Sequence, residues 1–177
     1  DWLDGGPGDD AFVVDSPADL VFEKPGEGND TVLAGIPGGG YILPDGVETL
    51  VLLGGTRFGI GNALGNRLTG DAAANWLFGG EGEDTLDGQA GPDLLFGQAG
   101  ADTFVFQRGA GADTIGDFTP GLDRLDLAAL GFAGFAAVLA ATTDHGGTAV
   151  IDCGQGDEVS LQGIAKAALL AGDFLLG

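Results

Sequence analysis

The chain has 177 residues, of which 27 are acidic and 6 basic, and its formal net charge is -21. This charge repels nucleic-acid phosphates and anionic membranes and attracts multivalent cations, so DNA, RNA and acidic lipid surfaces are poor partners. The 36 glycines are about three times the average share but lack the every-third spacing of collagen, and 44% of the residues are apolar, which argues against simple disorder.

Cysteine content and apolar runs exclude two further features. The single cysteine, Cys153, cannot close an internal disulfide. No basic segment followed by an apolar stretch opens the chain, and no apolar run reaches about 18 residues, so the sequence shows neither a signal peptide nor a membrane span. The first residues already look like the middle of a repeat, which suggests a fragment of a longer protein.

A nine-residue repeat begins at the N-terminus, with an acidic or polar residue at its sixth place and a large apolar residue at its eighth. Residues 5–13 fit G-G-x-G-x-D-x-U-x at every fixed place, where U is a large apolar residue. The sixth places are Asp1, Asp10 and Asp19, then, after a slip of two residues, Asp30, Gly39, Glu48, Arg57, Asn66, Asn75, Asp84, Asp93 and Asp102, and after another slip of two, Asp113. Nine consecutive units therefore keep one register.

Each unit predicts a turn followed by a short strand. In the x-U-x triplet the eighth residue points inward and its two neighbours point outward, because side chains alternate along a strand. Stacking of every second unit then sorts the outward side chains into two faces. One face would carry Ile42, Phe58, Ile60, Trp76, Phe78, Leu94 and Phe96, and the other Thr31, Thr49, Arg67, Thr69, Thr85, Asp87 and Thr103.

The nonapeptide resembles the repeat of RTX (repeats-in-toxin) proteins over about residues 1 to 125. The resemblance implies an all-β fold, a parallel β-roll with two units per coil, in which calcium ions lie between the stacked turns of every second unit. Calcium takes six to eight hard oxygen ligands, and carboxylates alone would gather too much negative charge, so backbone carbonyls must supply the rest. Glycine lets a turn aim several carbonyls at one point, which explains glycine and acid side by side.

The resemblance also implies a ligand set. One turn lends the carbonyls of its second and fourth places, the next turn on that edge lends those of its first and third, and both lend the sixth-place side chain. The better matches join Gly80, Gly82 and Asp84 to Gly97, Ala99 and Asp102; Asp71, Ala73 and Asn75 to Gly88, Ala90 and Asp93; Gln89, Gly91 and Asp93 to Arg108, Ala110 and Asp113; and Gln98, Gly100 and Asp102 to Asp117 and Asp123. The weaker ones join Asn62, Leu64 and Asn66 to Gly79, Glu81 and Asp84; Gly6, Gly8 and Asp10 to Glu27 and Asp30; and pair Glu48 with Asn66 and Asp1 with Asp19.

Departures from the repeat predict a calcium-poor middle around residues 36 to 60. Arg57 and Gly39 offer no side-chain oxygen, and Gly59 leaves an eighth place empty. Asn66 and Asn75 are neutral where the repeat has aspartate. For any single turn, glycine and aspartate can also simply mark an exposed loop. An EF-hand is excluded because its D-x-[DN]-x-[DN]-G-x₅-E run does not occur.

The apolar outward face predicts a cover. An exposed patch built from several such aromatic side chains is larger than a soluble monomer usually leaves open. We expect the C-terminal segment to cover it; the alternatives are an upstream domain or a partner chain. The partner could be a second copy, self-associating through Phe58, Trp76, Phe78, Leu94 and Phe96.

The C-terminal part is expected to cap the roll, which divides the chain into a roll at 1–116 and a cap at 117–177. The stretch 115–127 is similar to the strand and turn that follow the last repeat of RTX exoproteins. Residues 132–142 predict a short helix, 148–154 and 157–164 a hairpin, and the tail a helical turn with an apolar end. The tail sequence Asp173-Phe174-Leu175-Leu176 is similar to the uncleaved export signal of type I secreted RTX proteins, which implies an extracellular destination.

No catalytic motif accompanies the repeat. Zinc-protease chemistry of the H-E-x-x-H kind needs two histidines and only His145 is present, while Ser16 and Ser160 lie in no G-x-S-x-G motif. We therefore interpret the chain as a non-enzymatic module that binds several calcium ions, similar to the C-terminal domain of serralysin-like exoproteins. It would fold on calcium after export and support an upstream module such as a protease or lipase. The alternative is an alginate-binding module of an epimerase, although the six basic residues are scattered along the chain.

Overall fold

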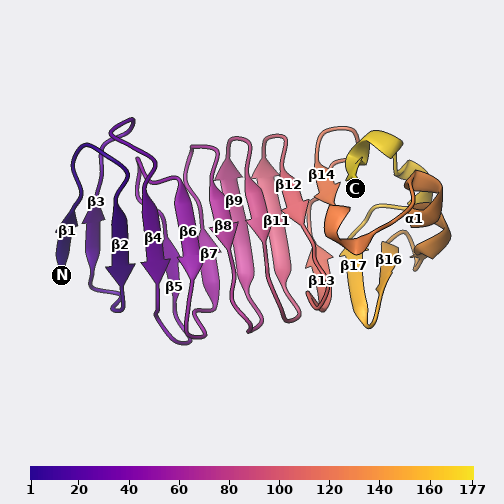
Figure 1. Cartoon of the computed structure of the whole chain (residues 1–177), viewed down its shortest axis with the longest axis horizontal. Coiled ribbons are helices and arrows are strands. Elements are labelled where there is room, and N and C mark those ends of the chain that lie inside the picture. Colours follow the sequence, from indigo (N-terminus) through magenta and orange to yellow (C-terminus); the bar gives the residue numbers. More distant parts are fainter.

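The computed structural model describes all 177 residues and shows a parallel β-solenoid, as the repeat predicts (Figure 1). Two eight-stranded sheets face each other, and the chain alternates between them. We call the first the threonine sheet; in order it contains β18 (Phe174–Leu175), β14 (Arg124–Asp126), β12 (Thr103–Val105), β10 (Thr85–Asp87), β8 (Arg67–Thr69), β6 (Thr49–Leu52), β4 (Thr31–Ala34) and β2 (Ala11–Val14).

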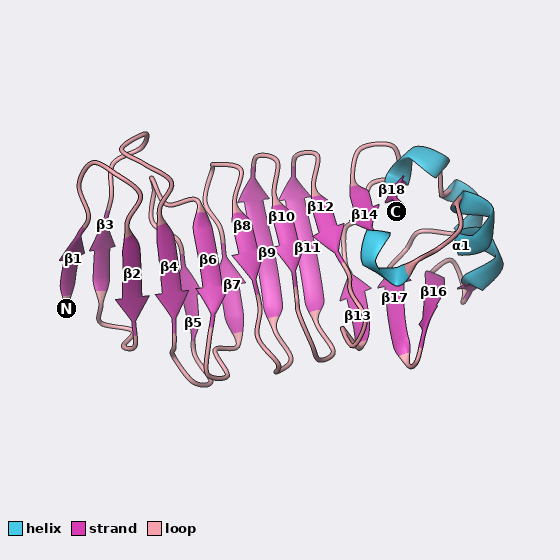
Figure 2. Ribbon diagram, in the orientation of Figure 1, coloured by secondary structure: helices cyan, strands magenta, loops and turns pink.

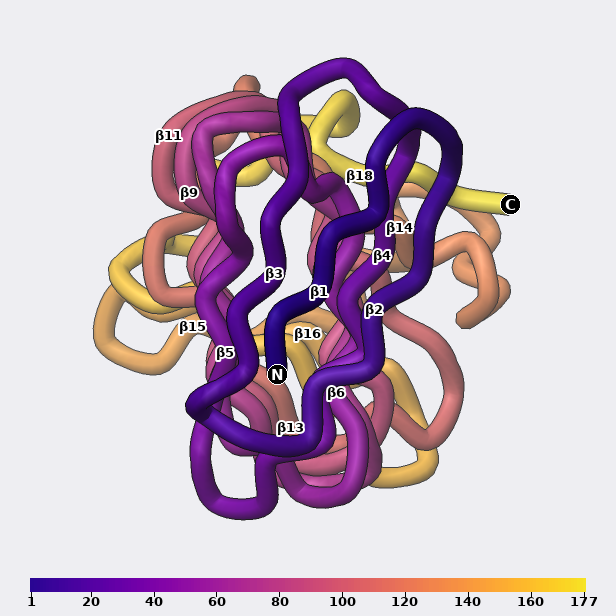
Figure 3. Tube along the Cα trace, turned by 90° about the vertical axis from the view of Figure 1, so that its left-hand side faces the viewer, coloured from indigo at the N-terminus to yellow at the C-terminus, as the bar shows by residue number.

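The second sheet, which we call the aromatic sheet, faces the first across the core. In order it contains β15 (Thr142–Asp144), β16 (Ala149–Gly154), β17 (Asp157–Leu161), β13 (Ala112–Ile115), β11 (Leu94–Ala99), β9 (Trp76–Glu81), β7 (Phe58–Ile60) and β5 (Gly40–Ile42). A separate two-stranded ribbon, β1 (Trp2–Asp4) with β3 (Leu20–Phe22), begins the roll. Seen along the solenoid axis, the strands form two walls joined by turns at both edges (Figure 3).

The strand register confirms the predicted spacing. Thr85 lies beside Arg67, and Leu94 lies beside Trp76, so each residue pairs with the one two repeats before it. The two slips in the repeat become longer coils. Across these coils β2 pairs with β4, and β11 pairs with β13. In both pairs the sequence separation between partner residues is larger by the inserted residues. The extra residues lie in the turns and thus leave the sheets in register.

The core lies between the two sheets and is built from the eighth places. Leu50, Leu68, Leu86 and Leu95 are fully buried there. Burying one leucine contributes about 1.5–3 kcal/mol, so the stack is the main apolar stabilisation of the roll. Gly59 occupies an eighth place without a side chain. A β-carbon there would lie 2.8 Å from Leu50 Cδ2, so neighbouring leucines already fill that space.

The C-terminal segment closes the end of the roll (Figure 2). The helix α1 (Phe135–Ala141) and the antiparallel hairpin of β16 and β17 confirm the predictions for these stretches. The tail forms 3-10 turns at Lys166–Ala168 and Ala171–Asp173 and then β18, a strand that the sequence did not suggest. Strand β17 pairs with β13, and β18 with β14, so the cap satisfies the open edges of both sheets.

The prediction that this segment covers the apolar outer face is wrong. The cap sits on the end of the solenoid (Figure 1) and leaves Trp76 42% and Ile42 61% exposed. Open strand edges carry unpaired N–H and C=O groups, and pairing them takes the residues that could have covered the face. On the face itself the rings of Phe78 and Phe96 stack at 5.1 Å, and the Arg57 guanidinium lies 4.6 Å from the Trp76 ring centre. None of the helices has the length and apolar character needed to cross a membrane.

Candidate metal centres

The sixth-place side chains form a ladder along each edge of the roll. On the edge before the threonine sheet, the backbone N–H of Asn66 donates to Asp84 Oδ1 at 2.7 Å, and that of Asp84 donates to Asp102 Oδ1 at 2.9 Å. On the other edge, the N–H of Asn75 donates to Asp93 Oδ1 at 2.8 Å. The same contact recurs from Asp10 to Asp30, Asp30 to Glu48, Asp93 to Asp113 and Asp102 to Asp123. One carboxylate oxygen of each acid is thus fixed to the preceding coil.

The second oxygen of several ladder carboxylates has no partner. The Oδ2 atoms of Asp30, Asp84 and Asp93 are buried and accept no hydrogen bond. A buried, unpaired anionic oxygen is costly, and such atoms are rare in folded proteins. A bound cation removes this cost, and carboxylate oxygen is the ligand that calcium prefers. The donor set therefore fits calcium.

First-place glycines make room for these oxygens. A β-carbon on Gly79, Gly88 or Gly97 would lie 2.2 Å from Oδ2 of the aspartate that ends the same turn. At the fourth place of the next turn, a β-carbon on Gly100 would lie 1.6 Å from the Gly82 carbonyl oxygen, and its φ of +147 is one that glycine tolerates. The turns thus stack at a spacing that leaves no room for side chains.

The predicted ligand sets lie on neighbouring coils, as expected. Gly80 pairs in register with Gln98, and Glu81 with Ala99. Several of the predicted carbonyls already accept one backbone hydrogen bond from the adjacent turn: those of Ala99, Ala110, Glu27, Asn62 and Asp71. A carbonyl oxygen has two lone pairs, so one such bond leaves capacity for an ion. The assignment of individual ligands stays a prediction.

The predicted final site differs from the others. Asp117 accepts the N–H groups of Gly97 at 3.1 Å and Gln98 at 2.9 Å. Asp123 Oδ2 accepts the N–H of Thr119 at 2.7 Å, and its other oxygen belongs to the ladder. Protein donors therefore satisfy these two acids. Arg108, whose carbonyl is a predicted ligand, donates its guanidinium to the Leu130 carbonyl at 2.9 Å, toward the cap.

Two asparagine side chains donate hydrogen bonds to turn carbonyls in the middle of the roll. Asn66 Nδ2 donates to the carbonyls of Val47 and Glu48, and Asn75 Nδ2 donates to that of Thr56 at 2.8 Å. Amide N–H groups thus point at turn carbonyls that an aspartate could only repel. This is a physical reason for the calcium-poor middle that the sequence predicts.

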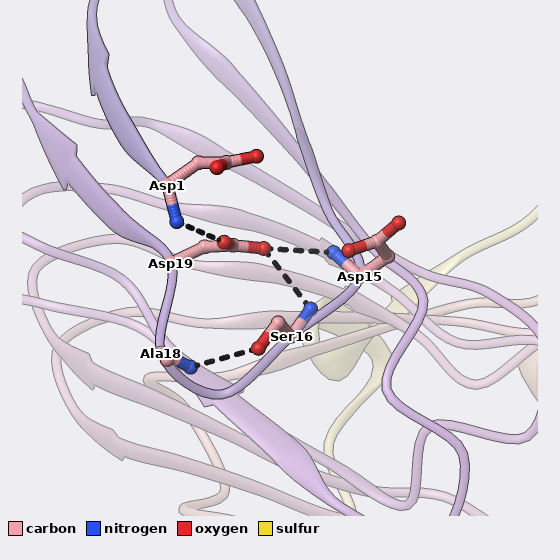
Figure 4. Close-up of polar contacts among 5 residues, drawn as sticks. All are labelled: Asp1, Asp15, Ser16, Ala18 and Asp19. Carbon is pink, nitrogen blue, oxygen red and sulfur yellow. Dashed lines mark hydrogen bonds and ion pairs between the residues drawn. The ribbon is translucent and has the colours of Figure 1, made fainter.

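The ladder position at Asp19 is also satisfied by protein donors. Asp19 accepts the amino group of Asp1 at 2.6 Å and the N–H groups of Asp15 at 3.2 Å and Ser16 at 3.0 Å (Figure 4). N–H donors thus take both Asp19 oxygens, and the predicted pairing of Asp1 with Asp19 around an ion stays a prediction.

Burial controls the ionisation of the ladder acids. Loss of solvation raises the pKa of Asp84 and Asp93 to about 6 and that of Asp113 to about 7, although backbone hydrogen bonds oppose the shift. Burial likewise raises the pKa of Asp102 and Asp123, with neighbouring carboxylates adding to it. Without a cation the stack resists full ionisation at neutral pH, and a nearby divalent ion would reverse this.

The structure adds one acid that sequence reasoning missed. Glu23 Oε2 is buried without a partner, close to the carboxylates of Asp10 and Asp30. The available signal was its position directly after β3, where the later repeats have glycine.

Among the nucleophilic side chains, Cys153 is buried, and burial raises its pKa to about 12, so its reactive thiolate does not form at neutral pH.

A family model and several solved structures are similar to this chain. The family model described as RTX calcium-binding nonapeptide repeat (4 copies) matches residues 60–95 and 81–115. The AlgE6R2 subunit of the Azotobacter vinelandii mannuronan C5-epimerase is 34% identical, over 66% of this chain and 91% of its own, with a TM-score of 0.48. The AlgE6R3 subunit of the same enzyme is 35% identical, over 64% of this chain and 79% of its own, with a TM-score of 0.28.

A third solved structure is the extracellular lipase LipA from Serratia marcescens. It is 16% identical with a TM-score of 0.48, and its match covers 100% of this chain, which spans only 38% of the lipase. No curated protein matches significantly. The matched repeats, rather than these overlays, carry the assignment. With their unbroken register and the parallel solenoid that they build, they show that this chain belongs to the RTX calcium-binding nonapeptide-repeat family.

Proposed function

We propose that this β-roll folds when it binds calcium outside the cell, and that its folding supports an upstream module of the same polypeptide. The observation that carries the proposal is the pair of buried, unpartnered carboxylate oxygens on Asp84 and Asp93. Each belongs to a ladder of stacked acids in a chain of net charge -21. Such a stack is unfavourable until cations enter it.

The energetics support coupling between binding and folding. Ordering the backbone costs about 1–2 kcal/mol per residue, and glycine has the most freedom to lose. Extracellular calcium modules bind with dissociation constants of about 10⁻⁴ to 10⁻³ M, so millimolar calcium adds on the order of 1 kcal/mol per site. Several sites acting on one solenoid reach the scale of a domain's whole stability. The far lower calcium of the cytosol would leave the chain unfolded.

The residues proposed to hold calcium are the acids of the C-terminal half of the ladder and the carbonyls around them. On one edge these are Asp84 and Asp102, and on the other Asp93 and Asp113. Bound ions would neutralise the ladder and tie each coil to the next. We propose no reaction for this module: any catalytic part would lie in the upstream module, and the roll would supply its extracellular stability.

The C-terminal tail suits export before folding. The Asp173 carboxylate is 1% exposed and accepts the N–H groups of Gly121 and Leu170, each at 2.8 Å. Phe174 is buried, and β18 completes the threonine sheet. We propose that type I secretion machinery reads this tail in the unfolded, calcium-free chain. Folding outside the cell would then bury it.

A second candidate function is binding of a polyuronate such as alginate. The likeness to two subunits of a mannuronan C5-epimerase favours testing it. An acidic roll without a basic groove would repel a polyanion, unless calcium bridges the two. Pull-down on alginate with calcium and with chelator decides, and retention only with calcium would favour this function.

The test of the proposed function is a calcium titration of the whole chain followed by circular dichroism, with bound ions counted at saturation. We expect a cooperative gain of β signal with calcium. Magnesium at equal ionic strength should not replace it, because magnesium demands a tighter octahedral shell. Chelator-treated protein that keeps its spectrum and melting temperature would refute the proposal.

A further inference from the structure

Three carboxylates converge at the N-terminal end of the roll. Oxygens of Asp10, Glu23 and Asp30 lie within 4.8 Å of one another. Asp30 is 0% exposed, and both its Oδ2 and Glu23 Oε2 are buried without a hydrogen-bond partner. Two independent observations thus coincide: a cluster of acids, and unpaired buried oxygens aimed into it.

The cluster differs from the nonapeptide sites in its third member. Asp10 and Asp30 are sixth-place residues of adjacent coils, and the N–H of Asp10 donates to Asp30 Oδ1 at 2.8 Å. Glu23 directly follows β3, at the place that Gly79 and Gly97 hold in later turns. Here a side-chain carboxylate enters where those turns present only backbone. The cluster also lies outside the residues that match the family model.

The surroundings fix the three acids but do not neutralise them. Glu23 Oε1 accepts the N–H of Lys24 at 2.9 Å, which leaves Oε2 free. A β-carbon on Gly5 would lie 2.6 Å from Glu23 Oε2 and 2.8 Å from Asp10 Oδ2, so backbone packs against both oxygens. The Lys24 ammonium pairs instead with Glu27 at 3.3 Å, and its side chain is 79% exposed. No cationic group of the chain balances the cluster.

We propose that Asp10, Glu23 and Asp30 form a three-carboxylate cation site that takes calcium and is more anionic than the nonapeptide sites. A surface hollow of about 230 Å³ beside Glu23, lined also by Asp4, Phe22, Lys24 and Glu27, gives an ion a route in. The inference rests on the proposed function, in that calcium is the ion that the chain would meet on folding.

The site lies where the ribbon of β1 and β3 meets the roll. The ribbon of β1 and β3 is hydrogen-bonded to neither large sheet. Glu23 follows β3, whereas Asp10 and Asp30 precede β2 and β4 of the threonine sheet. An ion shared by the three would fasten the ribbon to the first coil of the roll. Its loss should free the ribbon and leave the later coils folded.

The chain contains its own reporter for this site. The Trp2 ring stacks on Phe22, the residue before Glu23, with ring centres 4.0 Å apart. Terbium(III), a hard oxygen-seeking ion, emits when a nearby excited indole transfers energy to it. We would titrate terbium into the whole, calcium-saturated chain while exciting tryptophan. Trp2→Phe should abolish the emission of this site, and Trp76→Phe should preserve it.

The decisive variant is Glu23→Gln, which keeps the side-chain shape and the bond from Lys24. We expect at least a tenfold weaker terbium affinity at the site sensed by Trp2. The matched control is Asp15→Asn, which removes one exposed charge on the opposite turn of the same coil and should change affinity less than twofold. Equal affinities of Glu23→Gln and the unmodified chain, or absence of the Trp2-sensitised emission, would overturn the inference.

Two further readouts keep the result unambiguous. Emission lifetimes in H₂O and D₂O count the waters on the ion in the unmodified chain, and an ion that retains its full hydration shell also contradicts the proposal. Circular dichroism of Glu23→Gln with calcium separates the two hypotheses. If the variant still folds on calcium but loses the Trp2-sensed site, both stand; if the unmodified chain ignores calcium, the proposed function fails independently of the terbium result.

Discussion

Replacing Asp93 by asparagine should stabilise the ion-free protein and destabilise the calcium-bound one. Asp93 Oδ1 accepts the N–H of Asn75, and asparagine keeps that acceptor. Its Oδ2, buried without a partner, becomes an amide N–H₂. The Asn75 side chain of the preceding coil is turned differently, because its Oδ1 accepts the N–H of Asp71 at 2.7 Å and its Nδ2 donates to the Thr56 carbonyl at 2.8 Å. In the variant Oδ1 keeps the ladder contact, so the expected gain comes from removing the buried charge.

The magnitude follows from the pKa of Asp93. Burial raises it from 3.8 to about 6. Holding this group ionised at neutral pH therefore costs about 3 kcal/mol, of which we take about half because solvent at the turn screens the charge. The ion-free chain should therefore gain about 1.5 kcal/mol in the free energy of unfolding.

With calcium the sign reverses. Asp93 belongs to two predicted sites, and each contributes about 2.7 kcal/mol when calcium exceeds the dissociation constant about a hundredfold. Loss of one site or of both outweighs the gain from removing the charge, so the calcium-bound variant should be about 1–4 kcal/mol less stable. The sign change between the two conditions identifies a metal ligand.

The assay is urea unfolding followed by circular dichroism at neutral pH, in chelator and in excess calcium. If the ion-free chain is unfolded in buffer, its midpoint of folding in trimethylamine N-oxide replaces the urea midpoint. Asp45→Asn, at an exposed turn, is the control and should leave both values unchanged. A variant destabilised equally in both conditions would show that Asp93 acts through its hydrogen bond alone and not through an ion.

Three further outcomes follow from the same geometry. The pKa of Asp113 is about 7 in the ion-free fold, above its unfolded value, so the folded state binds protons more tightly. The stability of the ion-free chain should therefore rise as the pH falls from about 7.5 to about 4. Circular dichroism in chelator across this range checks it. Gly100→Ala places a β-carbon 1.6 Å from the Gly82 carbonyl and should cost about 3 kcal/mol or prevent folding, whereas Gly54→Ala, with open space around it, should cost about 1 kcal/mol by urea unfolding. Thr56→Val removes a buried hydroxyl that bonds to three backbone groups and should cost about 2–3 kcal/mol with or without calcium, which distinguishes it from every ladder acid in the same assay.

The repeat period was enough to predict the register of the roll. A nine-residue phase fixes which side chain faces inward, and the fully buried Leu68 and Leu86 lie where it places them. The strand Phe174–Leu175 could not be predicted, because two residues carry no periodicity and pair only once the edge of β14 is open. Glu23 was missed for a similar reason: its partners come from turns before and after it, and only the closed coil brings them together.

The position of the C-terminal cap could not be predicted from the sequence either. The sequence identifies an apolar C-terminal segment and an apolar outer face, and pairing the two is the simplest hypothesis. A parallel solenoid, however, ends in two open sheet edges whose backbone groups need partners. Apolar side chains can remain half-buried on a flat face at modest cost, whereas unpaired backbone cannot. Residues 157–161 and 174–175 accordingly extend the sheets.

The ladder explains why calcium need not act evenly along the roll. Each turn gathers carbonyl oxygens that require positive partners, and the sixth-place residue decides what those partners are. Asn66 and Asn75 supply amide N–H groups from the protein itself, whereas Asp84 and Asp93 supply more negative charge and leave an oxygen unpaired. On the proposed function, one nitrogen in place of one oxygen would thus change a coil from ion-dependent to self-sufficient. Because each coil contacts only its neighbours, the amide-held middle can order first and offer its edge to the acidic coils as the ions arrive.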